Sequence, residues 1–166
     1  MALEDLGPAE RFAAGAVGEP GRRRFFFEIS AGGRRLSLAT EKEQVAALAL
    51  QALQLLEQTG LDLDEEAVST LIEGGLSVGE PETVRFTVGN MTVGVASDSS
   101  LLTVVLEAAE GSDGISFLIS AEQLRAMALA AVEVIASGRP ICPWCRLPMD
   151  LEGHQCAATN GHHPHD

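Results

Sequence analysis

The prediction of the fold starts from RRRFFFEISAGGRRLSLA, residues 22–39. Residues 22–30 have the Phe and Ile content of a β-strand, and residues 34–39 alternate polar and apolar side chains, as strands with one buried face do. The AGG sequence at residues 31–33 reads as the turn between them. The segment therefore predicts a β-hairpin.

A long amphipathic helix is expected directly after this hairpin. Thr40 and Glu43 have the spacing of a capping box, in which two side chains satisfy backbone N–H groups at a helix start. The run VAALALQALQLLEQ that follows places apolar residues on one helical face, and Gly60 ends the pattern.

The second part of the chain repeats this order. Residues 101–109 and 114–119 read as strands around the turn EGSDG, and Ser120 with Gln123 caps another amphipathic run. Related motifs recur 74 positions apart upstream, as RFAAGAVG and RFTVGNMTVG, and 79 positions apart in the helices, as EQVAALAL and EQLRAMAL. An internal duplication fits this pattern, and so do two ordinary units that share a few positions by chance.

We therefore expect an α+β fold with two similar antiparallel strand-plus-helix halves. The halves are predicted at about residues 11–60 and 83–138, within a domain of residues 1–138. The linker, residues 61–82, carries a short helix near residues 65–73. A zinc-knuckle-like segment at residues 139–161 and a tail at residues 162–166 complete the chain.

The composition excludes several classes of protein. The formal net charge of -13 opposes binding to nucleic acid, where affinity comes mainly from Lys and Arg that neutralise phosphates. No apolar run approaches the roughly 20 residues of a membrane-spanning helix, and the acidic N-terminus MALEDLGPAERF lacks the pattern of a secretory signal. We expect a cytoplasmic protein without a membrane partner.

The cysteines gather in CPWCRLPMDLEGHQC, residues 142–156. Zn²⁺ prefers four thiolate or imidazole ligands, usually supplied as two short pairs, so we expect structural zinc at Cys142, Cys145, His154 and Cys156. His162, His163 or His165 could replace His154 as the fourth ligand. Two alternatives remain open, a redox dithiol formed by the first pair and plain buried or free cysteines.

An arginine-rich hairpin is the second candidate site. It holds Arg22, Arg23, Arg24, Arg34 and Arg35, which we expect to gather at one rim of the acidic molecule. Guanidinium groups bind phosphate or carboxylate in a bidentate manner, so such a cluster predicts a phosphorylated ligand or a protein partner. The alternative is that these arginines pair with the protein's own carboxylates, such as Glu19 and Glu28.

Two motifs carry a family resemblance. The first is G-x-V-G-E-P-G-x-R-x-F, with Gly18, Glu19, Pro20, Gly21, Arg23 and Phe25, and the second is C-P-x-C-x-x-P-x-D-x-x-G-H-x-C-x-x-x-N-G from Cys142 to Gly161. Together they resemble the uncharacterised bacterial family DUF3090 over nearly the whole chain. The resemblance implies that His154 belongs with the cysteines and that the GHH sequence is native, and it implies no particular reaction.

These observations favour a non-enzymatic, zinc-containing binding or adaptor protein that recognises its ligand through the arginine-rich hairpin. The sequence contains neither a phosphate-binding P-loop nor a G-x-G-x-x-G dinucleotide loop. Two alternatives remain, an enzyme that acts on a phosphorylated small molecule with a metal site, and a thiol redox protein that uses Cys142 and Cys145.

Overall fold

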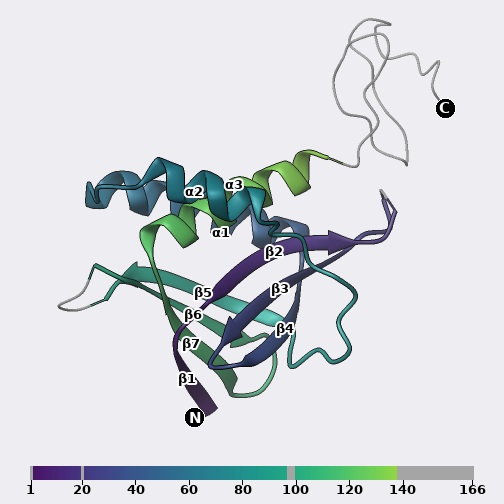
Figure 1. The fold of residues 1–166 in the computed structure, drawn as a ribbon. Coiled ribbons are helices and arrows are strands. Elements are labelled where there is room, and N and C mark those ends of the chain that lie inside the picture. Colours follow the sequence, from purple (N-terminus) through teal and green to yellow (C-terminus); the bar gives the residue numbers. More distant parts are fainter. Residues whose placement is uncertain (1, 20, 97–99, 138–166) are drawn as a thin grey trace, which may run out of the picture.

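The computed structural model describes residues 2–19, 21–96 and 100–137. These residues form strands and helices in the order β1 (Ala2–Pro8), β2 (Arg11–Val17), β3 (Arg24–Ala31), β4 (Arg34–Thr40), α1 (Lys42–Thr59), α2 (Glu65–Glu73), β5 (Val88–Val95), β6 (Leu102–Ala108), β7 (Asp113–Ile119) and α3 (Ala121–Ala136). The helices form a layer on one side of the strands (Figure 1). The predicted α+β class is confirmed.

The strands form two sheets. In one sheet, β2, β3 and β4 are consecutive antiparallel neighbours. In the other, β5, β6 and β7 are also consecutive and antiparallel, and β1 adds to β7 in parallel. Each half of the chain thus contributes three antiparallel strands followed by a helix, while β1 had no counterpart in the sequence prediction.

Each half also lends a short segment to the sheet of the other half. The N-terminal stretch pairs with β7 as β1, where Pro8 is the partner of Leu118. It then continues as β2. The stretch before β5 likewise meets β4 first, where Thr87 forms a parallel bridge with Ala39. Thr87 lies 79 positions after Pro8, and Leu118 lies 79 positions after Ala39. The two crossings therefore occur at corresponding places in the two halves.

The helices begin close to their expected positions, with one correction. Ser120 caps α3, and its hydroxyl accepts from Gln123 N at 3.1 Å, as predicted. The N-cap of α1, however, is Glu41, and its backbone N–H donates to Gln44 Oε1 at 3.0 Å. Thr40 is the last residue of β4, so it cannot cap the helix, and the predicted pair with Glu43 is wrong by one position.

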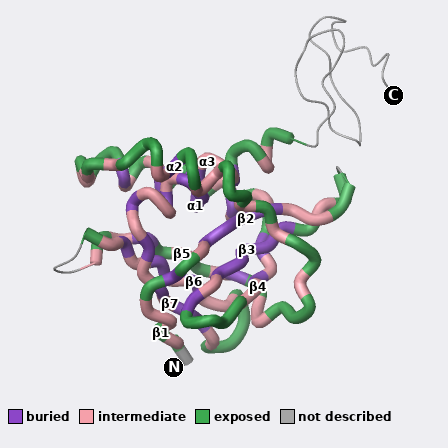
Figure 2. The backbone as a smooth tube through the Cα atoms, in the orientation of Figure 1, coloured by how far each residue is buried: buried purple, intermediate pink, exposed green. Residues whose placement is uncertain are grey.

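One hydrophobic core joins both sheets to the helices. At its centre the ring of Phe12 lies 5.8 Å from that of Phe27 and 5.0 Å from that of Phe117, in an edge-on contact with the second. Figure 2 shows the long buried stretches of β2 and β3 that contribute to it. Among the described residues, no helix is long and apolar enough to cross a membrane.

Candidate functional site

The predicted arginines lie at the two ends of the hairpin, so the expectation of one rim is wrong. In the antiparallel register Phe25 pairs with Thr40 and Ala31 pairs with Arg34. Six residues of extended chain separate these pairs, a distance of about 20 Å. Arg24 therefore lies at the open end of the hairpin, and Arg34 lies beside its turn.

At the turn end, both arginines bind carboxylates of the protein itself. Arg34 Nη1 forms an ion pair with Glu4 of β1. Arg35 Nε lies 3.8 Å from Glu28, a carboxylate that is mostly buried and also bound by Arg11. This end of the hairpin is consistent with the alternative in which arginines pair with the protein's own acidic residues.

The open end holds three consecutive arginines in different environments. Arg23 Nη1 donates to Val134 O of α3 at 2.8 Å, and its guanidinium lies 5.2 Å from the centre of the Phe25 ring. Arg24 Nη2 donates to Glu80 Oε1 at 2.6 Å, and this hydrogen bond raises the pKa of Arg24. Arg22 is exposed and has no side-chain partner among the described residues.

A groove of about 360 Å³ lies beside Arg23 and Arg24. Its lining comprises Arg23, Arg24, Phe25, Phe26, Ala39, Thr40, Glu41, Glu80, Pro81 and Val84. A second groove of about 500 Å³ lies toward the turn end and is lined by Glu28, Arg35, Ser37, Gly79, Glu80, Pro81, Glu82 and Thr83. The two grooves share Glu80 and Pro81, which stand between them.

Glu80 belongs to a strap, residues 75–84, that covers the outer face of the β2–β3–β4 sheet. Arg11 Nη2 donates to Ser77 O at 2.7 Å, and Val78 packs so closely that a Cβ on Gly15 would lie 2.9 Å from Val78 Cγ2. Gly15 pairs with Phe26, which is buried outside the shared core. The strap therefore holds Glu80 over this face.

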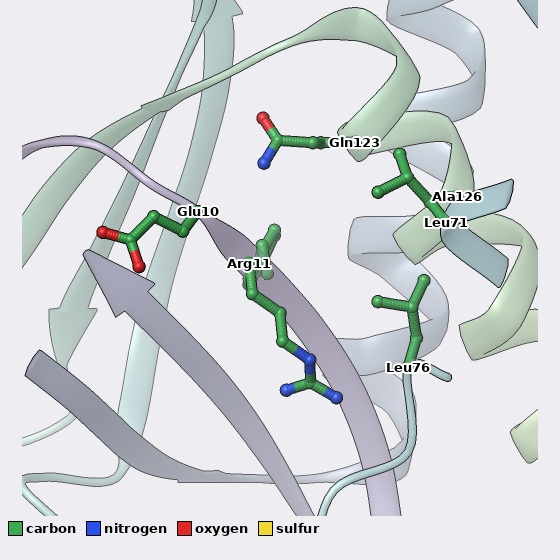
Figure 3. Close-up of a pocket in the computed structure, with 7 residues that line it drawn as sticks. Glu10, Arg11, Leu71, Leu76, Gln123 and Ala126 are labelled. Atoms are coloured by element: carbon green, nitrogen blue, oxygen red, sulfur yellow. The ribbon is translucent and has the colours of Figure 1, made fainter. Parts of the chain in front are cut away.

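A smaller pocket lies where the strap leaves α2, and its lining includes Arg11, Leu71, Leu76, Gln123 and Ala126. Arg11 and Leu76 lie on opposite sides of it in Figure 3. Its volume of about 30 Å³ is comparable to the share of one water molecule in the liquid. It is therefore part of the packing under the strap rather than a ligand site.

An ion-pair network at the turn end was missed by sequence reasoning. Arg85, just before β5, donates from Nε and Nη2 to Asp113 at 3.1 and 2.9 Å and from Nη1 to Glu4 at 2.6 Å. These hydrogen bonds lower the pKa of Asp113, while those from Arg34 and then Arg85 lower that of Glu4. The partners are far apart in the sequence, so no local pattern could reveal them.

The predicted zinc ligands Cys142, Cys145, His154 and Cys156 lie outside the described residues, as do His162, His163 and His165. The part of the chain that is described contains no group of three or more His, Cys, Asp or Glu side chains that could hold a metal ion.

No curated protein and no solved structure matches the chain. One family model does match, over residues 5–156, a range that includes both the arginine-rich hairpin and the three cysteines. Its description is protein of unknown function (DUF3090), and the chain belongs to this family.

Proposed function

We propose that the chain is a non-enzymatic binding protein that holds the phosphoryl group of a ligand or protein partner in the groove beside Arg22, Arg23 and Arg24. One observation carries the proposal. Arg23 and Arg24 line the same groove, and Arg22 beside them has no side-chain partner among the described residues. Arg34 and Arg35 are not part of this site, because they lie at the other end of the hairpin.

The chemistry of the groove suits a phosphoryl group. A guanidinium group presents planar paired N–H donors that match two phosphate oxygens, and hydrogen bonds between charged groups are about twice as strong as neutral ones. The apolar rings of Phe25 and Phe26 hold Arg23 and Arg24 by cation–π contacts, which limits their motion before a ligand arrives. The overall charge of -13 works against an extended polyanion such as nucleic acid.

Titration calorimetry with phenyl phosphate tests this function. Substituting Arg24 by Gln removes one charge-assisted contact and is expected to weaken binding roughly 10-fold or more. The matched control is Arg35→Gln, which removes the same charge at the other end of the hairpin and should leave the affinity unchanged. Absence of binding by the unmodified protein, or equal losses in both variants, would contradict the proposal.

The cysteine-rich segment is proposed to bind structural zinc through Cys142, Cys145, His154 and Cys156. Four protein ligands would complete the tetrahedral coordination of zinc and leave no position for a reacting water. This favours binding over catalysis on a phosphorylated small molecule. Cobalt substitution distinguishes the two, because only a site with an open position changes its visible spectrum when anions are added.

We also propose that the two halves arose by internal duplication. The supporting observations are the repeated order of three antiparallel strands and a helix, and the offset of 79 positions that the residues of the two crossings share. Chance similarity of two ordinary units predicts no shared offset at the crossings. Independent scrambling of either half should then impair folding of both, because each half completes the sheet of the other.

A further inference from the structure

We infer that the cysteine-rich segment, residues 142–156, packs against the exposed face of α1 in the way that α2 packs against α3. The inference rests on the proposed relation between the two halves and does not depend on the groove beside Arg24. Its basis is the offset of 79 positions between α1 and α3, whose third residues, Gln44 and Gln123, have the same capping role. The helix α1 then carries an intramolecular docking surface, and Trp144 is the apolar anchor of the segment.

The helix α2 covers one face of α3. Asp64 N, at the start of α2, donates to Glu122 Oε2 at 3.1 Å, and a carboxylate oxygen of Glu65 lies 3.6 Å from Arg125 Nε. On the same face, Ala126 lines the small pocket at the end of α2 and is only 1% exposed. The cover therefore combines polar contacts at the start of α3 with an apolar contact one turn further along.

The corresponding face of α1 has no such cover in the described part of the chain. Ala47 lies 79 positions before Ala126, yet it is exposed. Leu50 is 58% exposed, whereas Leu129, its counterpart in α3, is partly buried. Ala47 and Leu50 are three positions apart and so lie on the same side of the helix. Apolar side chains that are shielded in α3 thus face solvent in α1.

The chain that follows α3 corresponds to the chain that follows α1. The helix α2 spans Glu65–Glu73, and the positions 79 further on are residues 144–152, inside the cysteine-rich segment. The helices α1 and α3 pack against each other, so the chain that leaves α3 starts beside the helix that it is proposed to cover. The segment therefore follows α3 at the same place in the sequence as α2 follows α1.

The residues at corresponding positions predict an apolar contact. Glu65 and Arg125 pair between α2 and α3. Their counterparts at the same offset are Trp144 and Ala46. An ion pair in one half is thus matched by two apolar residues in the other. A large aromatic ring against a small side chain of α1 would remove apolar surface of both from water.

The segment itself needs an apolar surface to pack against. It contains four large apolar side chains, those of Trp144, Leu147, Met149 and Leu151. So short a segment cannot enclose them in a core of its own, and bound zinc would fix its backbone without burying them. The exposed face of α1 supplies the missing surface.

Trp144 is the only tryptophan of the chain, so its fluorescence reports directly on this segment. In the unmodified whole chain, its emission should be shifted to the blue of that of the urea-unfolded protein. Leu50→Glu places a charge in the contact and should shift the emission toward the unfolded value and raise the acrylamide quenching constant roughly threefold or more. Because Leu50 is exposed in the described structure, the far-UV circular dichroism should stay the same.

Val132→Glu is the matched control, because it makes the same kind of change at a 47% exposed position of α3. It should leave the emission and the quenching of Trp144 unchanged. An equal response to both variants, or an emission of the unmodified protein equal to that of the unfolded chain, would overturn the inference. Sedimentation velocity identifies the other occupant: a dimer that Leu50→Glu dissociates, with Trp144 quenching unchanged, would assign this face to a second copy and also overturn it.

Thermal denaturation supplies an independent measurement of the contact. Leu50→Ala and Trp144→Ala should each lower Tm, and the double variant should lose clearly less than the sum of the two shifts, because the second change removes a contact that is already lost. Additive losses would show that the two side chains do not touch and would contradict the inference.

Discussion

Gln44 and Gln123 make the same two contacts in the two halves of the chain. Each is the third residue of its helix, and its Oε1 accepts from the N-cap backbone N–H, at 3.0 Å for Gln44 and 2.8 Å for Gln123. Each Nε2 then donates to the other half, to Val88 O at 2.9 Å and to Ala9 O at 3.0 Å. Gln123 lies 79 positions after Gln44, and Val88 lies 79 positions after Ala9. An equivalent glutamine therefore fastens each helix to the opposite half.

Substituting either glutamine by alanine is predicted to lower the free energy of unfolding by a similar amount. Each change removes a helix cap and leaves a partly buried carbonyl without its donor, for which about 1–2 kcal/mol is expected. Urea denaturation of Gln44→Ala and Gln123→Ala would measure this loss. Gln54→Ala, at an exposed position of α1, should change stability by no more than about 0.5 kcal/mol. A large loss from only one of the two glutamines would contradict their equivalence.

The strap gives a second prediction, because it rests on Gly15. A Cβ there would meet Val78 Cγ2 at 2.9 Å and Val78 N at 3.3 Å, and the second of these is a backbone atom that cannot rotate away. Gly15→Ala should therefore displace the strap and lower stability by about 1–3 kcal/mol. Glutamyl endopeptidase should then cleave faster after Glu82 in the native protein.

Gly94 provides the matched control for this substitution. It lies in β5, 79 positions after Gly15, and a Cβ at Gly94 would meet nothing within 4 Å among the described residues. Gly94→Ala should leave both the stability and the cleavage rate after Glu82 nearly unchanged. Equal cleavage rates in the two variants would show that Val78 does not fix the strap.

The elements with strong local signals could be predicted from the sequence. The Phe-rich strand, its glycine turn and the Ser120 cap each depend on residues within a few positions of one another, and each lies where the pattern indicates. The strand β1 gave no such signal, because ALEDLGP has few β-branched or aromatic residues. Its partner β7 lies more than 100 positions away, so this pairing depends on tertiary structure alone.

The candidate site was predictable only in part, for a similar reason. Arginines close in the sequence were expected to be close in space, but Arg24 begins β3 and Arg34 begins β4 just after the turn, so the length of β3 separates them. Arg24 meets Glu80, and Arg85 meets Glu4 and Asp113, at separations that no local pattern encodes. The acidic partners of these arginines therefore could not be predicted from the positions of the arginines in the sequence.

The network around Arg85 predicts a pH dependence of stability. The pKa values of Glu4 and Asp113 are lowered in the folded protein, so near pH 4 the unfolded chain binds more protons at these groups than the folded chain does. Their contribution is complete above their unfolded pKa values and is lost as the pH falls through the lower folded values. Arg85→Gln should therefore flatten the dependence of the unfolding free energy on pH between about pH 5 and 3.

Urea denaturation at a series of pH values measures this slope. Lys42→Gln removes the same charge at a position with no ion pair in the described structure, and should keep the slope of the unmodified protein. Part of the slope should persist in Arg85→Gln, because Arg34 still binds Glu4. If both variants keep the full slope, the network does not control acid stability.

The zinc prediction depends on Cys142, Cys145, His154 and Cys156 and can be tested by elemental mass spectrometry of the whole chain. About one zinc ion per chain is expected, and it should be lost in Cys142→Ser and His154→Ala because a tetrahedral site needs all four ligands. His162→Ala is the matched control and should retain the metal. Retention in His154→Ala with loss in His162→Ala would assign the fourth ligand to the tail. Absence of zinc together with a reversible disulfide between Cys142 and Cys145 would instead favour redox chemistry, because only free thiolates can form that bond.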